Sequence, residues 1–254
     1  MIYIAFLFFT LMVLFIAFYQ WQYFMIFSPT YYREGELDDD FEMLAIKVDA
    51  DVELEGVVYD PKGAKATLLF FGGRSHDSVG LIKRLAQKFP TMRIISFNYR
   101  SYGKSGGVIS EKNILQDSLK VAKIIQKNYG DFYILGFSLG SSVASFVASK
   151  HRCRGVFLVG VYDSVAGVAK VKYGLDLSWI IRYKFDNTKV VKNIDAPTYV
   201  FVSKADTTTY IQNASEIKKY YKNLTYYVEL EHLSHKEILW SDEVIKKINE
   251  VVDA

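Results

Sequence analysis

The chain begins with a long apolar run, and its first charged side chain is Arg33. A single threonine interrupts the apolar residues from Ile2 to Tyr19, and no polar face alternates with an apolar one. A helix of about 20 such residues spans the roughly 30 Å hydrocarbon core of a bilayer. Trp21 and Tyr23 near its end suit the headgroup region. The pattern therefore predicts an uncleaved, single-pass transmembrane anchor over residues 1–30, without fixing its orientation.

Two other interpretations of this run stay open, a cleaved signal peptide and a buried core helix. A signal peptide normally has a basic start, a shorter apolar centre and a small-residue cleavage site, and none of these is clear here. A buried helix is disfavoured because no polar side appears. The acidic segment that follows, residues 31–42, is typical of a short polar linker leaving the membrane.

From residue 43 to residue 254 the pattern changes to alternating strands and helices. Apolar residues alternate with polar ones on both sides of a turn at residues 49–51, which predicts an antiparallel pair. Six short apolar runs follow that are typical of fully buried strands: Ala66–Phe71, Arg93–Phe97, Phe132–Leu135, Val156–Val161, Thr198–Val202 and Thr225–Leu230. Helical periodicity between them predicts a three-layer α/β domain with about eight mostly parallel strands. The region of about 163–197 is long enough for only a small lid.

Composition narrows the class of protein further. Half of the 254 residues are hydrophobic and 23% are charged, which is enough to bury a core and excludes global disorder. The net charge of +3 gives no indication of a nucleic-acid partner. A single cysteine, Cys153, excludes a disulfide framework and multi-cysteine metal sites, and we predict no metal site.

The strongest chemical signal is the sequence GFSLG at residues 136–140, which joins a buried strand directly to a helix of small residues. G-x-S-x-G in this context forces a tight turn that exposes the central serine, so Ser138 is the candidate nucleophile. A second copy of the pattern surrounds Ser105. That copy lies several residues beyond its strand and does not lead straight into a helix, so we favour Ser138.

A serine nucleophile needs a base, and the base needs an acid that orients it. In this topology the chain order is serine, acid, histidine, with the histidine after the last strand. We favour His235 over His232 because it lies where the final helices begin. Asp206, in a polar loop after the seventh strand, is preferred as the acid, and Asp163 after the sixth strand remains an alternative.

Backbone N–H groups must also stabilise the oxyanion of the tetrahedral intermediate. We expect one from Leu139, which follows the nucleophile, and one from Gly73 in the loop after the third strand. His76 in the same loop is either part of the pocket mouth or an ordinary solvated residue. This chemistry requires no cofactor.

These residues carry a family resemblance. Over nearly all of residues 44–254 the chain resembles the α/β-hydrolase superfamily, and it is most similar to the small, membrane-anchored serine hydrolases that lack a large cap domain. The segments that carry the resemblance are LLFFGGRSHD, SFNYRSYGKSGG, ILGFSLGSSVA, RYKFDNTKVVKNIDAPTYVFVSKAD and LSHKEILW. The resemblance implies that Ser138, Asp206 and His235 occupy the positions of the catalytic triad.

The leading hypothesis is a membrane-anchored serine hydrolase that cleaves an ester, a thioester or a lipid acyl bond through an acyl-enzyme. Its expected partners are a small-molecule or lipid acyl substrate and the membrane. A serine peptidase or amidase with the same triad is one alternative. A non-catalytic, membrane-bound scaffold of the same fold is the other, because a fold does not fix a function.

Overall fold

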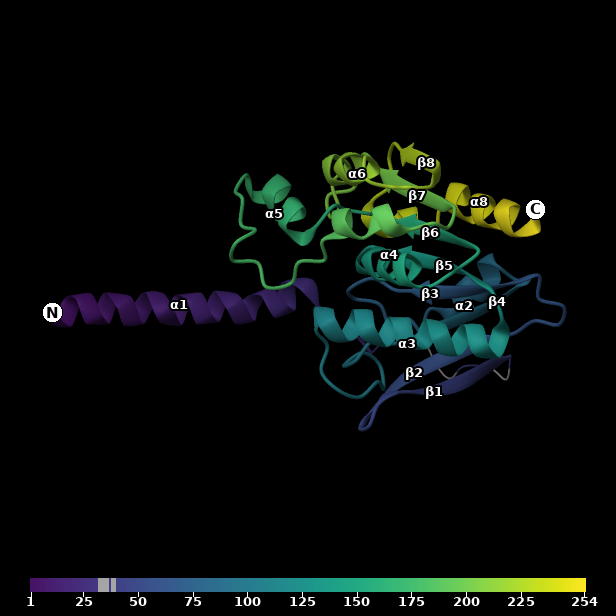
Figure 1. Ribbon diagram of the computed structural model, residues 1–254, viewed down its shortest axis with the longest axis horizontal. Helices are drawn as coiled ribbons and strands as arrows, with labels where there is room; N and C mark the ends of the chain where they lie inside the picture. Colours follow the sequence, from purple (N-terminus) through teal and green to yellow (C-terminus); the bar gives the residue numbers. More distant parts are fainter. Residues whose placement is uncertain (32–36, 38–39) are drawn as a thin grey trace.

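A single twisted sheet of eight strands forms the centre of the computed structural model, which describes residues 1–31, 37 and 40–254 (Figure 1). The strand order is β1-β2-β4-β3-β5-β6-β7-β8, and only β2 runs antiparallel to its neighbours. The bounds are β1 Phe41–Asp49, β2 Val52–Tyr59, β3 Ala66–Phe71, β4 Met92–Phe97, β5 Phe132–Phe137, β6 Gly155–Val159, β7 Thr198–Ser203 and β8 Leu224–Leu230. The predicted fold class is confirmed.

Helices cover both faces of the sheet, which explains why the central strands are apolar on both sides. In β3, Leu69 and Phe71 belong to the core under α3, α4 and α6, whereas Leu68 and Phe70 belong to the core under α2, α7 and α8. The bounds are α2 Ile82–Lys88, α3 Glu111–Tyr129, α4 Leu139–Lys150, α5 Val165–Tyr173, α6 Ile211–Lys218, α7 His235–Ile238 and α8 Asp242–Asp253, with short 3₁₀ turns η1 Asn187–Lys189 and η2 Val191–Asn193. The helices α5, η1 and η2 fall within the predicted lid region, between β6 and β7.

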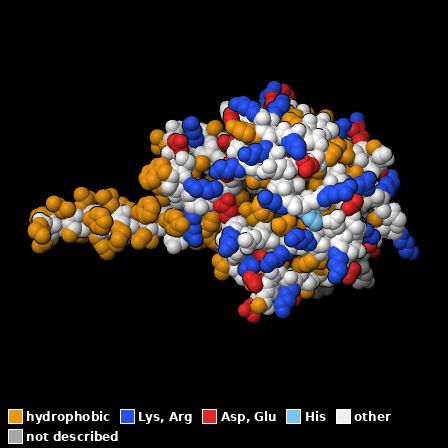
Figure 2. Space-filling model, in the orientation of Figure 1, with side chains coloured by type: hydrophobic (Ala, Val, Ile, Leu, Met, Phe, Trp, Pro, Cys, Tyr) orange, Lys and Arg blue, Asp and Glu red, His pale blue; other side chains and the backbone are white. Residues whose placement is uncertain are grey.

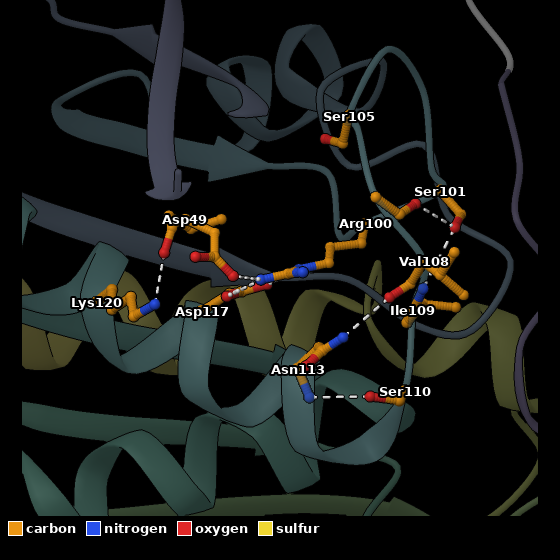
Figure 3. A network of polar contacts seen from close by, with 12 residues as sticks. Asp49, Arg100, Ser101, Ser105, Val108, Ile109, Ser110, Asn113, Asp117 and Lys120 are labelled. Atoms are coloured by element: carbon orange, nitrogen blue, oxygen red, sulfur yellow. Dashed lines mark hydrogen bonds and ion pairs between the residues drawn. The ribbon is translucent and has the colours of Figure 1, made fainter. Parts of the chain in front are cut away.

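A buried ion pair fixes the loop after β4 to the helical layer (Figure 3). The Arg100 guanidinium donates two hydrogen bonds to Asp117 of α3, at 2.6 and 3.0 Å, and contacts Asp49 at the end of β1. The pKa of Arg100 is raised by the hydrogen bond from its guanidinium to Asp117, although burial opposes the charge. This pair holds the polar loop at residues 98–110 against α3.

Helix α1 (Ile2–Ile26) projects from one end of the domain, and hydrophobic side chains cover it on every visible side (Figures 1 and 2). It has 25 residues and is long and apolar enough to cross a membrane, by length and composition alone. The predicted linker, residues 31–42, lies mostly outside the described residues, since 32–36 and 38–39 are not described. Strand β1 already begins at Phe41, inside the expected linker.

The end of α1 packs onto the domain. The side-chain amide of Gln22 is buried, donates to the Ile180 carbonyl oxygen at 3.0 Å and accepts from the Arg182 N–H at 2.8 Å. Phe27, just after the helix, has no exposed surface and meets the ring of Tyr183 edge-on, with centroids 4.8 Å apart. Both ends of the amide are therefore satisfied, and the aromatic ring is part of the core.

The chain stays on the domain for several residues beyond the helix. The Ser28 N–H donates to the Arg74 carbonyl oxygen and to the Tyr102 hydroxyl, and the Thr30 carbonyl oxygen accepts from the Gly103 N–H at 3.0 Å. We call residues 22–31 the docked segment. The chain is therefore fixed to the domain as far as residue 30, ahead of most of the predicted linker, which lies outside the described residues.

We predict that Phe27→Ala lowers the free energy of unfolding by about 3–5 kcal/mol, the usual cost of removing a fully buried phenylalanine ring. Phe24→Ala is the matched control, since that ring is 67% exposed on the same helix end and its loss should change stability by about 0.5 kcal/mol or less. Urea unfolding of both variants in detergent micelles measures the difference. Equal effects would show that the docked segment does not stabilise the domain.

Candidate active site

Ser138 lies in a sharp turn between β5 and α4, with φ 55° and ψ −119°. A positive φ is unfavourable for a residue with a side chain, so the surrounding packing must impose it. The two glycines of the motif supply that packing. A Cβ on Gly136 would lie 2.4 Å from the Gly140 carbonyl oxygen, and one on Gly140 would lie 2.0 Å from the Phe71 carbonyl oxygen. The backbones of β3, β5 and α4 thus meet where no side chain fits.

Three of the predicted residues are joined by a continuous line of hydrogen bonds. Ser138 Oγ lies 2.8 Å from His235 Nε2, and His235 Nδ1 lies 2.7 Å from Asp206 Oδ2. Because an ionised carboxylate only accepts hydrogen bonds, Nδ1 carries the proton of a neutral His235 and donates it. Nε2 is then free to accept the serine proton. Ser138 follows the carboxyl end of β5, Asp206 that of β7 and His235 that of β8. All three residues therefore lie at the same edge of the sheet.

The loop after β7 holds Asp206 in its ionised form. Burial of this carboxyl group favours its neutral form, but hydrogen bonds from His235 and from the N–H groups of Thr209 and Thr208 outweigh that effect and lower its pKa. The Thr209 hydroxyl also donates to Oδ2, at 2.8 Å. The carboxylate therefore carries its charge at neutral pH and fixes the orientation of the imidazole.

The structure does not bring the alternative residues into this line. Asp163 accepts a hydrogen bond from the Asn213 side chain at 2.8 Å, and its pKa is raised by burial. His232 is exposed on the loop after β8. Ser105 is buried in the loop shown in Figure 3, where its hydroxyl donates to the Asn98 carbonyl oxygen and accepts from the Glu55 N–H.

The two predicted oxyanion donors flank the serine. Leu139 is the first residue of α4, and the first N–H groups of a helix have no acceptor within it. A Cβ on Gly73 would lie 3.5 Å from the Cβ of Ser138, so this residue is adjacent to the nucleophile. Its N–H donates to His76 Nδ1 at 3.2 Å. The Gly73 N–H is thus close to Ser138, but in this structure it is hydrogen-bonded to the His76 imidazole.

His76 takes a defined place in the site. Its ring stacks on Phe137, with centroids 5.2 Å apart and planes inclined by 10°. Burial, together with the nearby His235 and Lys236, lowers the pKa of His76 to about 4. The imidazole is therefore neutral at physiological pH, which lets Nδ1 accept the Gly73 N–H.

Sequence reasoning missed Gly160 and Thr209. Gly160 follows β6 with φ +63°, and a Cβ there would lie 3.0 Å from His235 Cε1. The residue leaves room for the histidine ring. A glycine directly after a buried strand, at the edge where parallel strands end, is the signal that would have pointed to it. Thr209 had no such signal, because its role depends on how the loop after β7 folds.

A cavity of about 580 Å³ opens beside Ser138 and His235. Apolar side chains of α1 line one part of it and residues of α5 and the following loop line another. Its volume lies within the roughly 300–1,000 Å³ typical of small-molecule sites. Within residues 1–31, 37 and 40–254, no group of three His, Cys, Asp or Glu side chains is arranged to hold a metal ion.

Known structures resemble this chain closely in fold and distantly in sequence. An esterase from Pyrococcus furiosus aligns with a TM-score of 0.68 and 18% identity, over 90% of this chain and 97% of its own. A lipase-esterase related protein from Clostridium acetobutylicum gives 0.63 and 19%, over 78% and 99%. The α/β hydrolase GrgF from a Penicillium species gives 0.69 and 11%, over 84% and 98%. No family model and no curated protein sequence matches. The protein has the α/β-hydrolase fold, as the sequence resemblance implied.

The low pKa of His76 makes stability depend on pH. The unfolded chain binds a proton at this histidine near pH 6.5, whereas the folded protein does so only near pH 4. The contribution of neutral His76 to the free energy of unfolding is fully present above pH 6.5. It is lost as the pH falls toward 4, by at most about 1.4 kcal/mol per pH unit. We therefore expect the free energy of unfolding to fall between pH 6.5 and 4.5, and His76→Gln to reduce that slope.

Urea unfolding at several pH values measures this slope. His232→Gln is the matched control, because His232 is exposed and does not line the cavity. An unchanged slope in His76→Gln would mean that His76 is not held neutral by the fold.

Proposed function

We propose that this protein is a serine hydrolase, anchored in a membrane by α1, that cleaves an ester, a thioester or a lipid acyl bond. The observation that carries the proposal is the line of hydrogen bonds from Ser138 through His235 to Asp206. The fold is that of proteins described as esterases and α/β hydrolases, which supports hydrolytic chemistry. The largely apolar lining of the cavity supports an acyl substrate over a peptide.

In the proposed acylation step, His235 Nε2 takes the proton of the Ser138 hydroxyl while Oγ attacks the substrate carbonyl carbon. The carbonyl oxygen becomes negatively charged and accepts hydrogen bonds from the Leu139 and Gly73 N–H groups. Gly73 exchanges its His76 acceptor for this oxyanion. Asp206 stabilises the imidazolium that forms.

The tetrahedral intermediate then collapses to an acyl-enzyme. The bond to the leaving group breaks, and His235 Nε2 gives its proton to the departing oxygen or sulfur. Water enters, loses a proton to the same nitrogen and attacks the acyl carbon. The acid leaves, Ser138 regains its proton, and no cofactor is consumed.

The anchoring part of the proposal rests on two features of α1. Its length and composition suit a bilayer, and residues 2–17 are almost entirely exposed apolar side chains. The docked segment supports an uncleaved helix, because removal of residues up to Phe27 would take a fully buried ring out of the core. A cleaved signal peptide has no such packing role.

We expect Ser138→Ala to abolish labelling by a fluorophosphonate probe and to lower kcat on small esters by roughly 10⁴-fold or more, because the attacking oxygen is lost. Ser105→Ala is the matched control and should keep labelling, since its hydroxyl only bridges backbone groups in a loop. Loss of labelling in Ser105→Ala but not in Ser138→Ala would identify Ser105, in the second copy of the motif, as the nucleophile.

The same assay tests the two partners of the serine. Asp206→Asn should lower kcat by about 10⁴-fold, because the imidazole loses the acceptor that fixes its tautomer. His235→Ala should have an effect as large, whereas Asp163→Asn and His232→Ala should retain most of the activity. Rates on matched esters, thioesters and short peptides then identify which class of bond the protein cleaves. A preference for peptides would show that the protein is a peptidase and not an esterase.

The full-length protein should stay in the membrane pellet after alkaline carbonate extraction, because a spanning helix is held by apolar burial and not by charge. The double variant Phe8→Asp/Met12→Asp places two charges in the proposed span and should be released. Release of the unaltered protein would contradict anchoring and leave the catalytic proposal untouched.

A further inference from the structure

The face of α1 that meets the cavity is defined by helical spacing. Five residues of the helix line the cavity at Ser138, and they recur at intervals of three, one, three and one: Phe18, Trp21, Gln22, Met25 and Ile26. Residues with these spacings share one side of an α-helix. Phe24, one residue away and on another side, is 67% exposed and does not line the cavity. One side of the membrane helix is therefore a wall of the candidate active site.

A second part of the cavity wall comes from the segment after β6. Val165, Val168 and Ala169 of α5 face the cavity, and so do Leu177 and Ile181 from the loop that follows. The Gln22 amide joins the two walls by its hydrogen bonds to the backbone of residues 180 and 182. This link fixes the rotation of α1 and its distance from the segment after β6. The cavity is preformed.

The apolar face of α1 continues from the cavity toward the N-terminus. Leu11, Leu14 and Phe15 precede Phe18 by seven, four and three residues, so they lie on the same side of the helix. Their side chains are more than half exposed. At 1.5 Å per residue, the face from Leu11 to Met25 is about 21 Å long. It connects the part of α1 proposed to lie in lipid with the nucleophile, without a charged residue between them.

The adjacent part of the domain also suits a membrane surface. Figure 1 shows α5 and the loop after it on the side from which α1 projects. Leu175 and Trp179 of this loop are 61% and 79% exposed, and Lys170 and Lys172 lie nearby in α5. Exposed aromatic and aliphatic residues with lysines beside them are typical of the interface between lipid and water.

We propose that α1 is a wall of the acyl-binding site and that the substrate is a membrane lipid whose acyl chain reaches Ser138 along this helix, without passing through water. The proposal rests on the proposed function and adds the substrate class and its route. The helix thus contributes to specificity as well as to anchoring. Met25 and Trp21 are the specificity-determining residues, since they line the cavity that holds Ser138 and follow Phe18 toward the end of α1 that packs on the domain.

The first test compares two tryptophan variants of the full-length protein in detergent micelles. Met25→Trp fills part of the cavity, and Phe24→Trp places the same side chain on another side of the same helical turn. With p-nitrophenyl esters of two to sixteen carbons, we expect Met25→Trp to lower the ratio of kcat/KM for long chains to that for acetate by tenfold or more. Phe24→Trp should leave the ratio within twofold of the unaltered protein.

Trp21→Ala guards against poor folding of Met25→Trp, since Trp21 is half exposed and its removal adds no bulk. It should also lower the long-chain ratio, because apolar contact with the chain is lost. An unchanged ratio in both variants, while fluorophosphonate still labels Ser138, contradicts the inference alone. Failure of the unaltered protein to react with fluorophosphonate or to hydrolyse any ester overturns the proposed function itself.

The second test identifies where the chain comes from. The protein is reconstituted into phosphatidylcholine vesicles in which one acyl chain carries a photoreactive diazirine, and the crosslinked peptides are sequenced after illumination. Crosslinks to Val168 or Ile181, inside the cavity, support arrival from the bilayer, and Met25→Trp should remove them. Crosslinks confined to residues 2–17 contradict that route.

Discussion

Strand β5 passes into helix α4 through Ser138, and the backbone is too crowded for a side chain at the two glycines on either side of it, Gly136 and Gly140. Gly136 and Gly140 allow β3, β5 and α4 to meet, and the close approach holds Ser138 at a positive φ that it would not adopt alone. The hydroxyl consequently points away from the sheet edge in a fixed direction, and every other part of the site is arranged around it.

The remaining parts of the site reach the serine because parallel strands end at one edge. Asp206 and His235 arrive from the ends of β7 and β8, and the Gly73 loop arrives from the end of β3. Neighbouring residues hold two of these groups in place. The Thr209 hydroxyl donates a hydrogen bond to the Asp206 carboxylate, and Gly160, which has no side chain, leaves room for the His235 ring. Such supports matter because a hydrogen-bonded line of three side chains works only if each rotamer is held. The sheet determines where the groups arrive, and the loops determine how they point.

Sequence reasoning predicted the strands to within one or two residues at most boundaries, because fully buried strands appear as short continuous apolar runs bounded by polar or turn residues. It also selected Ser138, His235 and Asp206, since their order and their places after strands follow from the topology. It missed what depends on the contacts of loops. The hydrogen bond from Gly73 to His76 and the space at Gly160 both require the fold of a loop, which no local pattern encodes. The docked segment was missed for another reason: a helix that is apolar all round gives no indication of which side meets the protein.

Because α1 is apolar on all sides, the contacts at its end determine which side of the helix faces the cavity. A helix in lipid is free to rotate, and a rotation by one residue, about 100°, would bring a different set of side chains to the cavity. Gln22 prevents this, because its buried amide would lose two hydrogen-bond partners and the part-buried backbone groups at residues 180 and 182 would lose theirs. Phe27 adds the same constraint through its burial in the core. The residues that hold the helix to the domain therefore also decide which of its side chains face Ser138, so one set of contacts would set both the proposed position of α1 in the membrane and the shape of the proposed acyl site.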